Sequence, residues 1–444
     1  MIKNFEKPMK YSAYLGYLLP SVLTMIFLSF YTTIDGFFVS RFAGSDALAG
    51  INIVIPITCV IFGVAVMLAT GSGAIIGELL GKKEHKKASE VFCFMCVVLL
   101  IFSIIFAGIG IAFLKPISYL LGSSDRLLEH VLPYALITFL GTLPMSFKLF
   151  FEYLVRSDGN SKVGLAMSIT GLVLNVLLDY IFVGIFKMGT LGAALGTVIS
   201  ISISALIGLI YFLKYGHIKF CKPKADFRVL MKSCTNGSSE MLTELSTGIT
   251  TLLFNIMVMK YFGEDGVAAV TIIMYIYYFF ISFYMGVAVA TAPVVSYNVG
   301  SRNHQKIIET LKHSFLTIGI SSFVIVAISL LEGQAIIGLF VQNGNVFDIT
   351  WNGLKLFSPV FLFIGVNVFL SGYFTALGNG LVSAIISSLR SLLLVIVFII
   401  ALPPIVGVSG IWLTMPLSEA ATIIIAIQLY RKRGRVTPEL QQSN

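Results

Sequence analysis

The chain has 444 residues, of which 57% are hydrophobic and only 11% are charged. A soluble domain carries about 25% charged residues, so this composition excludes an ordinary soluble globular protein and predicts a polytopic helical membrane protein. The net charge of +9 does not indicate nucleic-acid binding, because basic residues of membrane proteins mark their cytoplasmic loops.

Apolar runs bounded by Gly, Pro and charged residues divide the chain into twelve predicted membrane-spanning helices. Several exceed the ~20 residues that a straight crossing needs, which predicts tilt or kinks. The first run is too long for the core of a signal peptide, so we expect it to remain as a helix. The predicted spans are 14–42, 46–80, 88–114, 131–156, 162–186, 189–214, 235–262, 266–299, 307–332, 350–377, 381–403 and 408–430.

The distribution of basic residues predicts the orientation. With the N-terminus inside the cell, the predicted inner segments hold 22 Lys and Arg residues and the outer segments hold 5. Cytoplasmic loops carry the excess of Lys and Arg, so both termini are expected to be cytoplasmic.

The two halves of the chain repeat one another. The segment "GSDALAGINIVIPI" from Gly44 aligns with "GEDGVAAVTIIMYI" from Gly263 at an offset of 219, and ten of the 47 aligned positions to Glu90 are identical. Six spans per copy give both copies the same orientation, a parallel repeat suited to alternating access in a transporter, more than to a channel. We therefore predict an N-lobe over 1–214, a cytoplasmic linker over 215–234 and a C-lobe with a basic tail over 235–444.

Four polar residues from three spans of the first half lie at one predicted depth. Asp179 and Asp35 come near the outer ends of outward-running spans, and Thr197 lies eight residues into the next inward-running span. At 1.5 Å per residue each is ~10–12 Å below the outer rim. Asn175 precedes Asp179 by four residues and therefore shares its helix face.

Two carboxylates at one level of a membrane interior are costly as separate ions. They become tolerable when they share a proton, or when they bind a cation together with amide and hydroxyl oxygens, which are ligands suited to Na⁺. The alternative is structural: each Asp caps a helix break or bonds a backbone amide. We favour a coupling-ion site.

These motifs resemble the MATE family of multidrug and toxic compound extrusion transporters. The stretches "DGFFVSRFAGSDALAGINI" and "NVLLDYIFVG" and the internal repeat carry the resemblance, and "NGSSEMLTELS" at 236–246 is similar to the MepA-like bacterial branch. The resemblance covers essentially the whole chain. It implies an all-α, V-shaped pair of pseudo-symmetric six-helix bundles in a bacterial cytoplasmic membrane.

The resemblance also implies roles for individual residues. An N-lobe cation site in relatives matches Asp35, Asn175, Asp179 and Thr197, and a first-helix proline proposed to bend with the charge state of that site matches Pro20. The NorM-like branch has a further carboxylate in its tenth helix. Residues 356–377 contain no carboxylate, so that C-lobe site is not carried over.

Charged residues of the second half form a separate group. Glu240 and Glu244 lie four apart near the inner end of the seventh span, and Arg390 enters the eleventh span from the same side. Glu244 and Arg390 are expected at equal depth and are predicted to pair as a structural brace, with drug contact as the alternative. Glu419, in the last span, has no partner that the sequence identifies.

Two further patterns have competing interpretations. Lys148, Glu152 and Arg156 step by four along the fourth span, which is typical of a helix end whose long side chains reach toward water. The aromatic run 275–284 suits a cleft for flat cationic drugs, through stacking and cation–π contacts, or a lipid-facing surface. Its candidate cleft residues are Tyr275, Tyr277, Tyr278 and Tyr284.

These features predict a secondary antiporter that exports organic cations in exchange for H⁺ or Na⁺, and neither an enzyme nor a nucleic-acid-binding protein. We expect a monomer with no cofactor, and no metal ion other than Na⁺ at the coupling site. A flippase for lipid-linked oligosaccharides shares the broad architecture and is the alternative, but it needs cationic residues in its cleft. A lipid-modifying membrane enzyme needs clustered His residues or paired Asp residues, which the sequence does not contain.

Overall fold

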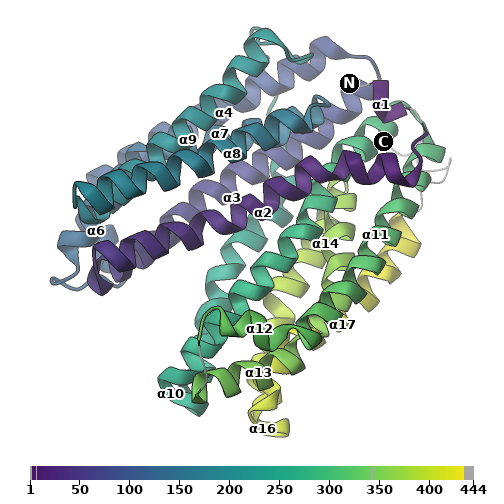
Figure 1. Ribbon diagram of the computed structural model, residues 1–444. Helices are drawn as coiled ribbons and strands as arrows, with labels where there is room; N and C mark the ends of the chain where they lie inside the picture. Colours follow the sequence, from purple (N-terminus) through teal and green to yellow (C-terminus); the bar gives the residue numbers. More distant parts are fainter. Residues whose placement is uncertain (1–2, 7, 342–343, 435–444) are drawn as a thin grey trace.

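The computed structural model describes residues 3–6, 8–341 and 344–434, except the side chains of residues 3–4, 30–37, 40 and 45. The regular structure of the described residues consists of helices, without strands. They form two bundles that diverge from one another in a V, which opens away from the end where both chain termini lie (Figure 1). The predicted all-α, V-shaped architecture is confirmed.

The N-lobe comprises the purple to teal helices of Figure 1. Its fourth predicted span is two helices that meet at a bend of 54°, and its fifth ends in a π-helical turn. Its helices are α1 (Lys3–Glu6), α2 (Tyr11–Phe42), α3 (Ser45–Gly81), α4 (His85–Ala112), α5 (Leu114–Leu120), α6 (Leu128–Leu140), α7 (Thr142–Ser157), α8 (Ser161–Asp179), η1 (Tyr180–Ile185) and α9 (Gly189–Lys214).

The C-lobe comprises the green to yellow helices. The long helix α10 changes direction at Gly263, whose φ of 64° is non-helical, so it contains two of the predicted spans. The helices are α10 (Phe227–Gly300), α11 (His304–Leu331), α12 (Gly333–Gly338), α13 (Asn345–Phe357), α14 (Val360–Ala376), α15 (Gly380–Ser388), η2 (Leu389–Leu393), α16 (Leu394–Val406), α17 (Ser409–Leu429) and η3 (Tyr430–Gly434).

The predicted number of spans agrees with these helices. Within the described ranges, nine helices are long and apolar enough to cross a membrane. The bent pairs α6–α7 and α13–α14, the latter at 56°, raise the number to eleven. Because α10 contains two spans, the total is the predicted twelve.

The backbone repeats at the offset that the sequence predicts. Left-handed φ values occur at Gly44 and again at Gly263, and at Gly159 and again at Gly378, each pair 219 residues apart. These turns need a residue that tolerates positive φ, which explains why glycine occupies them in both copies. The two lobes are therefore two copies of one six-helix unit.

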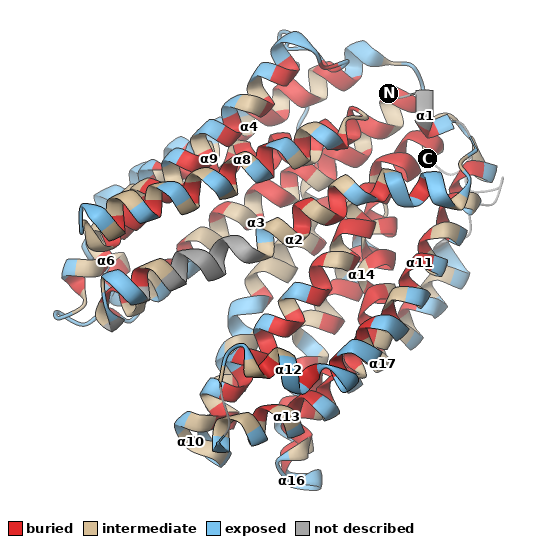
Figure 2. Ribbon diagram, viewed as in Figure 1, coloured by how far each residue is buried: buried red, intermediate tan, exposed pale blue. Residues whose placement is uncertain are grey.

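The outer surface of each bundle is apolar and the interior is tightly packed. Figure 2 shows exposed residues along the outward faces of both bundles and buried residues between the helices. Large apolar side chains such as Ile104, Phe323 and Ile400 are exposed. Such a surface is stable in lipid, where no hydrophobic force drives it inward.

The segment between the lobes is fastened to the N-lobe. Asp158, at the α7–α8 turn, is fully buried and accepts hydrogen bonds from the backbone N–H groups of His217 (2.9 Å) and Ile218 (3.0 Å) and from the Tyr211 hydroxyl (2.7 Å). The chain then crosses to Phe227, where α10 begins, earlier than the predicted end of the linker at 234. These hydrogen bonds fix residues 217–218 to the N-lobe.

The lobes meet where α3 packs against α10, near the end of the molecule that carries the termini. A Cβ atom added to Gly300 would lie 1.9 Å from the backbone oxygen of Glu78, and one added to Gly81 would lie 2.0 Å from that of Tyr297. Gly81 and Gly300 are themselves 219 residues apart, so the contact is nearly two-fold symmetric. Glycine here allows two helix backbones to approach closely and close this end of the V.

Gly300→Ala is expected to force α3 and α10 apart, because the new methyl group overlaps backbone atoms that cannot rotate away. We expect a loss of about 1–3 kcal/mol of stability and a lower melting temperature in detergent. Gly319→Ala is the matched control, since a Cβ on that residue of α11 meets no atom within 4 Å. Equal melting temperatures of the two variants would contradict this role of Gly300.

Candidate functional site

The N-lobe site is built around Asp179, the last residue of α8. Its side chain is fully buried, and the π-helical turn η1 follows it directly. Its Oδ1 atom faces Gly196 of α9, where an added Cβ would lie only 2.5 Å away. Space for this carboxylate therefore depends on glycine at position 196 of the neighbouring helix α9. Single π turns inside helices are frequent at functional sites.

Two of the other predicted residues lie beside Asp179. Asn175 is one turn earlier on α8, and its Nδ2 donates a long hydrogen bond of 3.5 Å to Oγ1 of Thr197 on α9. Asn175 is fully buried and Thr197 is 7% exposed. A carboxylate, an amide and a hydroxyl thus converge between α8 and α9, an oxygen-rich group of the kind that holds a proton or a hard cation.

The remaining residues predicted for this site are on α2, which packs against α8. The side chain of Asp35 lies outside the described residues. Pro20 lies inside α2, and its backbone oxygen accepts a hydrogen bond of 2.8 Å from the Thr24 hydroxyl. A proline within a helix removes one backbone hydrogen bond and gives α2 a point at which it can bend.

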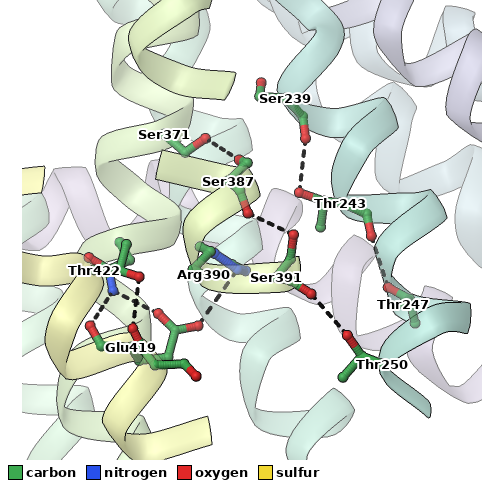
Figure 3. Close-up of polar contacts among 12 residues, drawn as sticks. Ser239, Thr243, Thr247, Thr250, Ser371, Ser387, Arg390, Ser391, Glu419 and Thr422 are labelled. Carbon is green, nitrogen blue, oxygen red and sulfur yellow. Dashed lines mark hydrogen bonds and ion pairs between the residues drawn. The ribbon is translucent and has the colours of Figure 1, made fainter. Parts of the chain in front are cut away.

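The C-lobe corrects a predicted pairing. Arg390 forms an ion pair with Glu419 of α17, at 3.8 Å between Nη1 and Oε1, and not with Glu244 (Figure 3). Asn367 of α14 donates from Nδ2 to Oε2 of Glu419 at 2.7 Å. Glu419 and Asn367 are fully buried and Arg390 is 5% exposed. Counting residues from the membrane surface predicts depth, but not the direction in which a side chain leaves its helix.

A cavity of about 70 Å³ lies between the lobes, lined by α3 and α7 on one side and by α10 and α14 on the other. Its wall is mostly apolar, and among the described residues that line it Glu240 is the one carboxylate. Tyr153 lies opposite, on α7, and Arg390 lies within electrostatic range of Glu240. The cavity is smaller than the about 300 Å³ or more of most small-molecule sites.

The aromatic run does not line this cavity. Tyr277 and Tyr284 are buried in the C-lobe core, and the Tyr284 hydroxyl lies 3.1 Å from both the Ser322 hydroxyl and the backbone oxygen of Phe361. Tyr275 is 42% exposed and stacks on Phe340, while Tyr278 is partly buried against the same core. The predicted cleft role is therefore wrong for Tyr277 and Tyr284. Their spacing of seven residues, which repeats on one helix face, is the sequence signal of a core position.

The three charged residues spaced four apart on α7, Lys148, Glu152 and Arg156, are also buried. Glu152 contacts the Lys148 ammonium at 2.5 Å and the Arg156 guanidinium at 3.1 Å. Glu152 and Arg156 have no exposed area and Lys148 is 7% exposed, so the prediction that they reach toward water is wrong. They form a three-charge cluster inside the N-lobe, in which the central carboxylate holds two cations.

Comparison with known proteins identifies the family. The MatE family model matches residues 20–181 and 241–400. The chain belongs to the MatE family. The two matched segments begin 221 residues apart, close to the internal offset of 219, so each lobe of this MatE protein carries one copy of the family unit.

Individual MatE relatives match over nearly the whole chain. The multidrug export protein MepA of Staphylococcus aureus is 24% identical over 444 residues, which cover 99% of this chain and 97% of MepA. A crystal structure of a MATE protein in complex with MaL6 has a TM-score of 0.91 at 20% identity. An outward-facing multidrug resistance MATE family transporter of the MOP superfamily has a TM-score of 0.90 at 20% identity, and each structure matches over 97% of both chains. At this identity the solved structures establish the fold.

Glu152→Gln is expected to destabilise the N-lobe strongly, because it leaves Lys148 and Arg156 buried without their counter-charge. We expect a loss of about 3–5 kcal/mol, seen as a much lower melting temperature or a low yield of folded protein. Glu84→Gln, which removes the partly exposed pair with Lys87, is the control and should cost less than about 1 kcal/mol. A Glu152→Gln protein that melts like the parent would show that the cluster is dispensable for folding.

Proposed function

We propose that this MatE protein is a secondary active antiporter that exports organic cations in exchange for H⁺ or Na⁺ by alternating access. The observation that carries the proposal is the buried group of Asp179, Asn175 and Thr197 in a membrane protein of this family. An ionisable residue inside a membrane is costly and marks an ion pathway more often than a structural contact.

The N-lobe site binds the coupling ion. Asp179 supplies the charge that a proton or Na⁺ neutralises, and Asn175 and Thr197 supply neutral oxygens. We place Asp35 in the same site because of the family resemblance and its predicted depth. The change of charge in this layer alters the packing of α2, in which Pro20 permits a bend.

The cavity between the lobes binds the exported molecule. Its apolar wall suits an organic molecule, and Glu240 suits a positive charge on it. An acidic wall also disfavours the alternative, a flippase for lipid-linked oligosaccharides, whose pyrophosphate substrate needs cationic partners. The MepA relative is named a multidrug export protein, which supports the export of drug-like molecules by this chain.

Alternating access follows from the construction of the two lobes. The V opens away from the termini, and the α3–α10 contact closes the opposite end. With both termini cytoplasmic, this arrangement is an outward-facing state that releases its cargo outside the cell. Rigid-body rocking of the lobes about their contact then exposes the cavity to each side in turn.

Asp179→Asn and Asp35→Asn are expected to reduce gradient-driven ethidium export to the leak of protein-free liposomes, because the amide cannot exchange a proton or hold a cation by charge. Export is measured from proteoliposomes under a pH gradient and, separately, under a Na⁺ gradient. Asp46→Asn removes a partly exposed carboxylate that pairs with Arg126 and serves as the control. Normal export by both site variants under either gradient would overturn the proposed coupling.

Glu240→Gln is expected to weaken ethidium binding to the purified protein by about tenfold, because the cavity loses the charge that faces the cation. Binding is followed by ethidium fluorescence in detergent. Glu264→Gln, an exposed carboxylate elsewhere on α10, should leave the affinity unchanged. Equal affinities of the two variants would place the cation elsewhere.

A further inference from the structure

The C-lobe contains a buried cation, Arg390, with two carboxylates in its surroundings. Arg390 is 3.8 Å from Glu419, which also accepts a hydrogen bond from Asn367. Glu240, which lines the cavity, is within electrostatic range of the same guanidinium. Arg390 lies in the π-helical turn η2, the class of helix irregularity that commonly accompanies function.

A route of hydroxyl groups connects this region with the cavity. The Ser387 hydroxyl, three residues before Arg390, is 2.8 Å from the Ser371 hydroxyl, and Ser371 is 2.9 Å from Ser383. Ser383 is 2.8 Å from the hydroxyl of Thr375, which lines the cavity. All four are buried, so a chain of hydroxyl groups leads from the helix that carries Arg390 to the cavity (Figure 3 shows Ser371, Ser387 and Arg390).

The internal repeat argues that the fold itself does not require this ion pair. At the offset of 219, Arg390 corresponds to Gly171 in the N-lobe. In the last span of each copy the offset is 218, which aligns the left-handed Gly189 with Gly407 and Glu419 with Ile201. The N-lobe therefore builds the same helices without either charge. A buried ion pair is weak evidence for stability, so its presence in one copy calls for another explanation.

Resting on the proposed antiport, we propose that Arg390 is a built-in substitute for the exported cation: when Glu419 binds a proton, the Arg390 guanidinium moves from Glu419 to Glu240 and displaces the organic cation from the cavity. Glu419 thereby becomes a proton-binding site of the C-lobe. The guanidinium stays protonated throughout, and only the proton that forms the Glu419 O–H bond is taken up.

Charge balance supports this exchange. Before it, Glu419 is neutralised by Arg390 and Glu240 by a monovalent cation from the cell. After it, Glu419 is neutralised by its proton and Glu240 by Arg390. Both states leave these groups without net charge in a low-dielectric region, so neither state carries the cost of an uncompensated buried ion.

The surroundings of Glu419 select a proton over Na⁺. The Arg390 guanidinium already occupies one side of the carboxylate and would repel a metal cation, whereas a proton replaces that guanidinium. Apart from Arg390, one further titratable group of the described residues, Tyr277 of α10, is within electrostatic range of Glu419. Around Glu240, the corresponding groups are Glu244 and Tyr153.

The test measures the ethidium affinity of the purified full-length protein by fluorescence from about pH 5 to about pH 8. For the parent protein the affinity should rise with pH, because a deprotonated Glu419 retains Arg390. Glu419→Gln mimics the protonated state, so it should bind ethidium at least about tenfold more weakly at high pH. In Glu419→Gln/Arg390→Gln no competing cation remains, and the affinity should return to the high-pH value of the parent or exceed it.

Two outcomes would overturn the proposal: Glu419→Gln binds as tightly as the parent across the pH range, or the double variant stays as weak as Glu419→Gln. Glu264→Gln controls for the loss of an exposed carboxylate. If Glu419→Gln does not fold, the double variant still decides, since an unchanged pH dependence there excludes this role. The experiment uses no gradient, so it can fail while the Asp179 transport test succeeds, and the reverse.

Discussion

Charge inside a low-dielectric interior has to be neutralised, and this constraint organises the molecule. Ionisable groups inside a membrane are expensive unless they pair or exchange ions. Glu152 holds Lys148 and Arg156 in the N-lobe, and Arg390 holds Glu419 in the C-lobe. Asp179 and Glu240 have a different setting, beside neutral oxygens and on a cavity wall respectively. The carboxylates proposed to act in transport are Asp179, Glu240 and Glu419, and in each the proposed cycle changes the counter-charge.

The duplicated scaffold lets such an exchange drive movement. Each lobe is a packed bundle whose core takes side chains from the other half of the chain, such as Leu18 of α2 in the C-lobe core and Tyr297 of α10 in the N-lobe core. The backbones of α3 and α10 also approach closely at glycines, including Gly81 and Gly300. Glycines let these backbones pack closely and hold this end of the V together, and the proposed tilt of the two bundles takes place about this contact. The attachment of the linker through Asp158 keeps the N-lobe a unit during that movement.

Much of this architecture could be predicted from the sequence, because the signals are periodic and strong. The twelve spans, the internal offset and the shared depth of Asn175, Asp179 and Thr197 follow from hydropathy, repetition and the rise per residue. Counting residues from the membrane surface failed to predict the partner of Arg390. Such a count gives the depth of a residue, but not the side of the helix from which its side chain leaves. The partner on α17 could have been found from the repeat, since Glu419 corresponds to Ile201, one turn from Thr197 in the N-lobe site. The prediction that Tyr277 and Tyr284 line a cleft was wrong because it used the aromatic composition of the run. Their spacing of seven residues is typical of core positions.

The most direct test of the account is a count of the ions that leave when a cation binds. Purified protein in a weakly buffered, Na⁺-free solution is titrated with ethidium at a pH near the middle of its pH-dependent range, and proton release is read with an indicator. If buried charge must stay balanced, binding one ethidium should release a measurable fraction of a proton, up to about one. Ethidium binding with no proton release under these conditions would contradict the central claim.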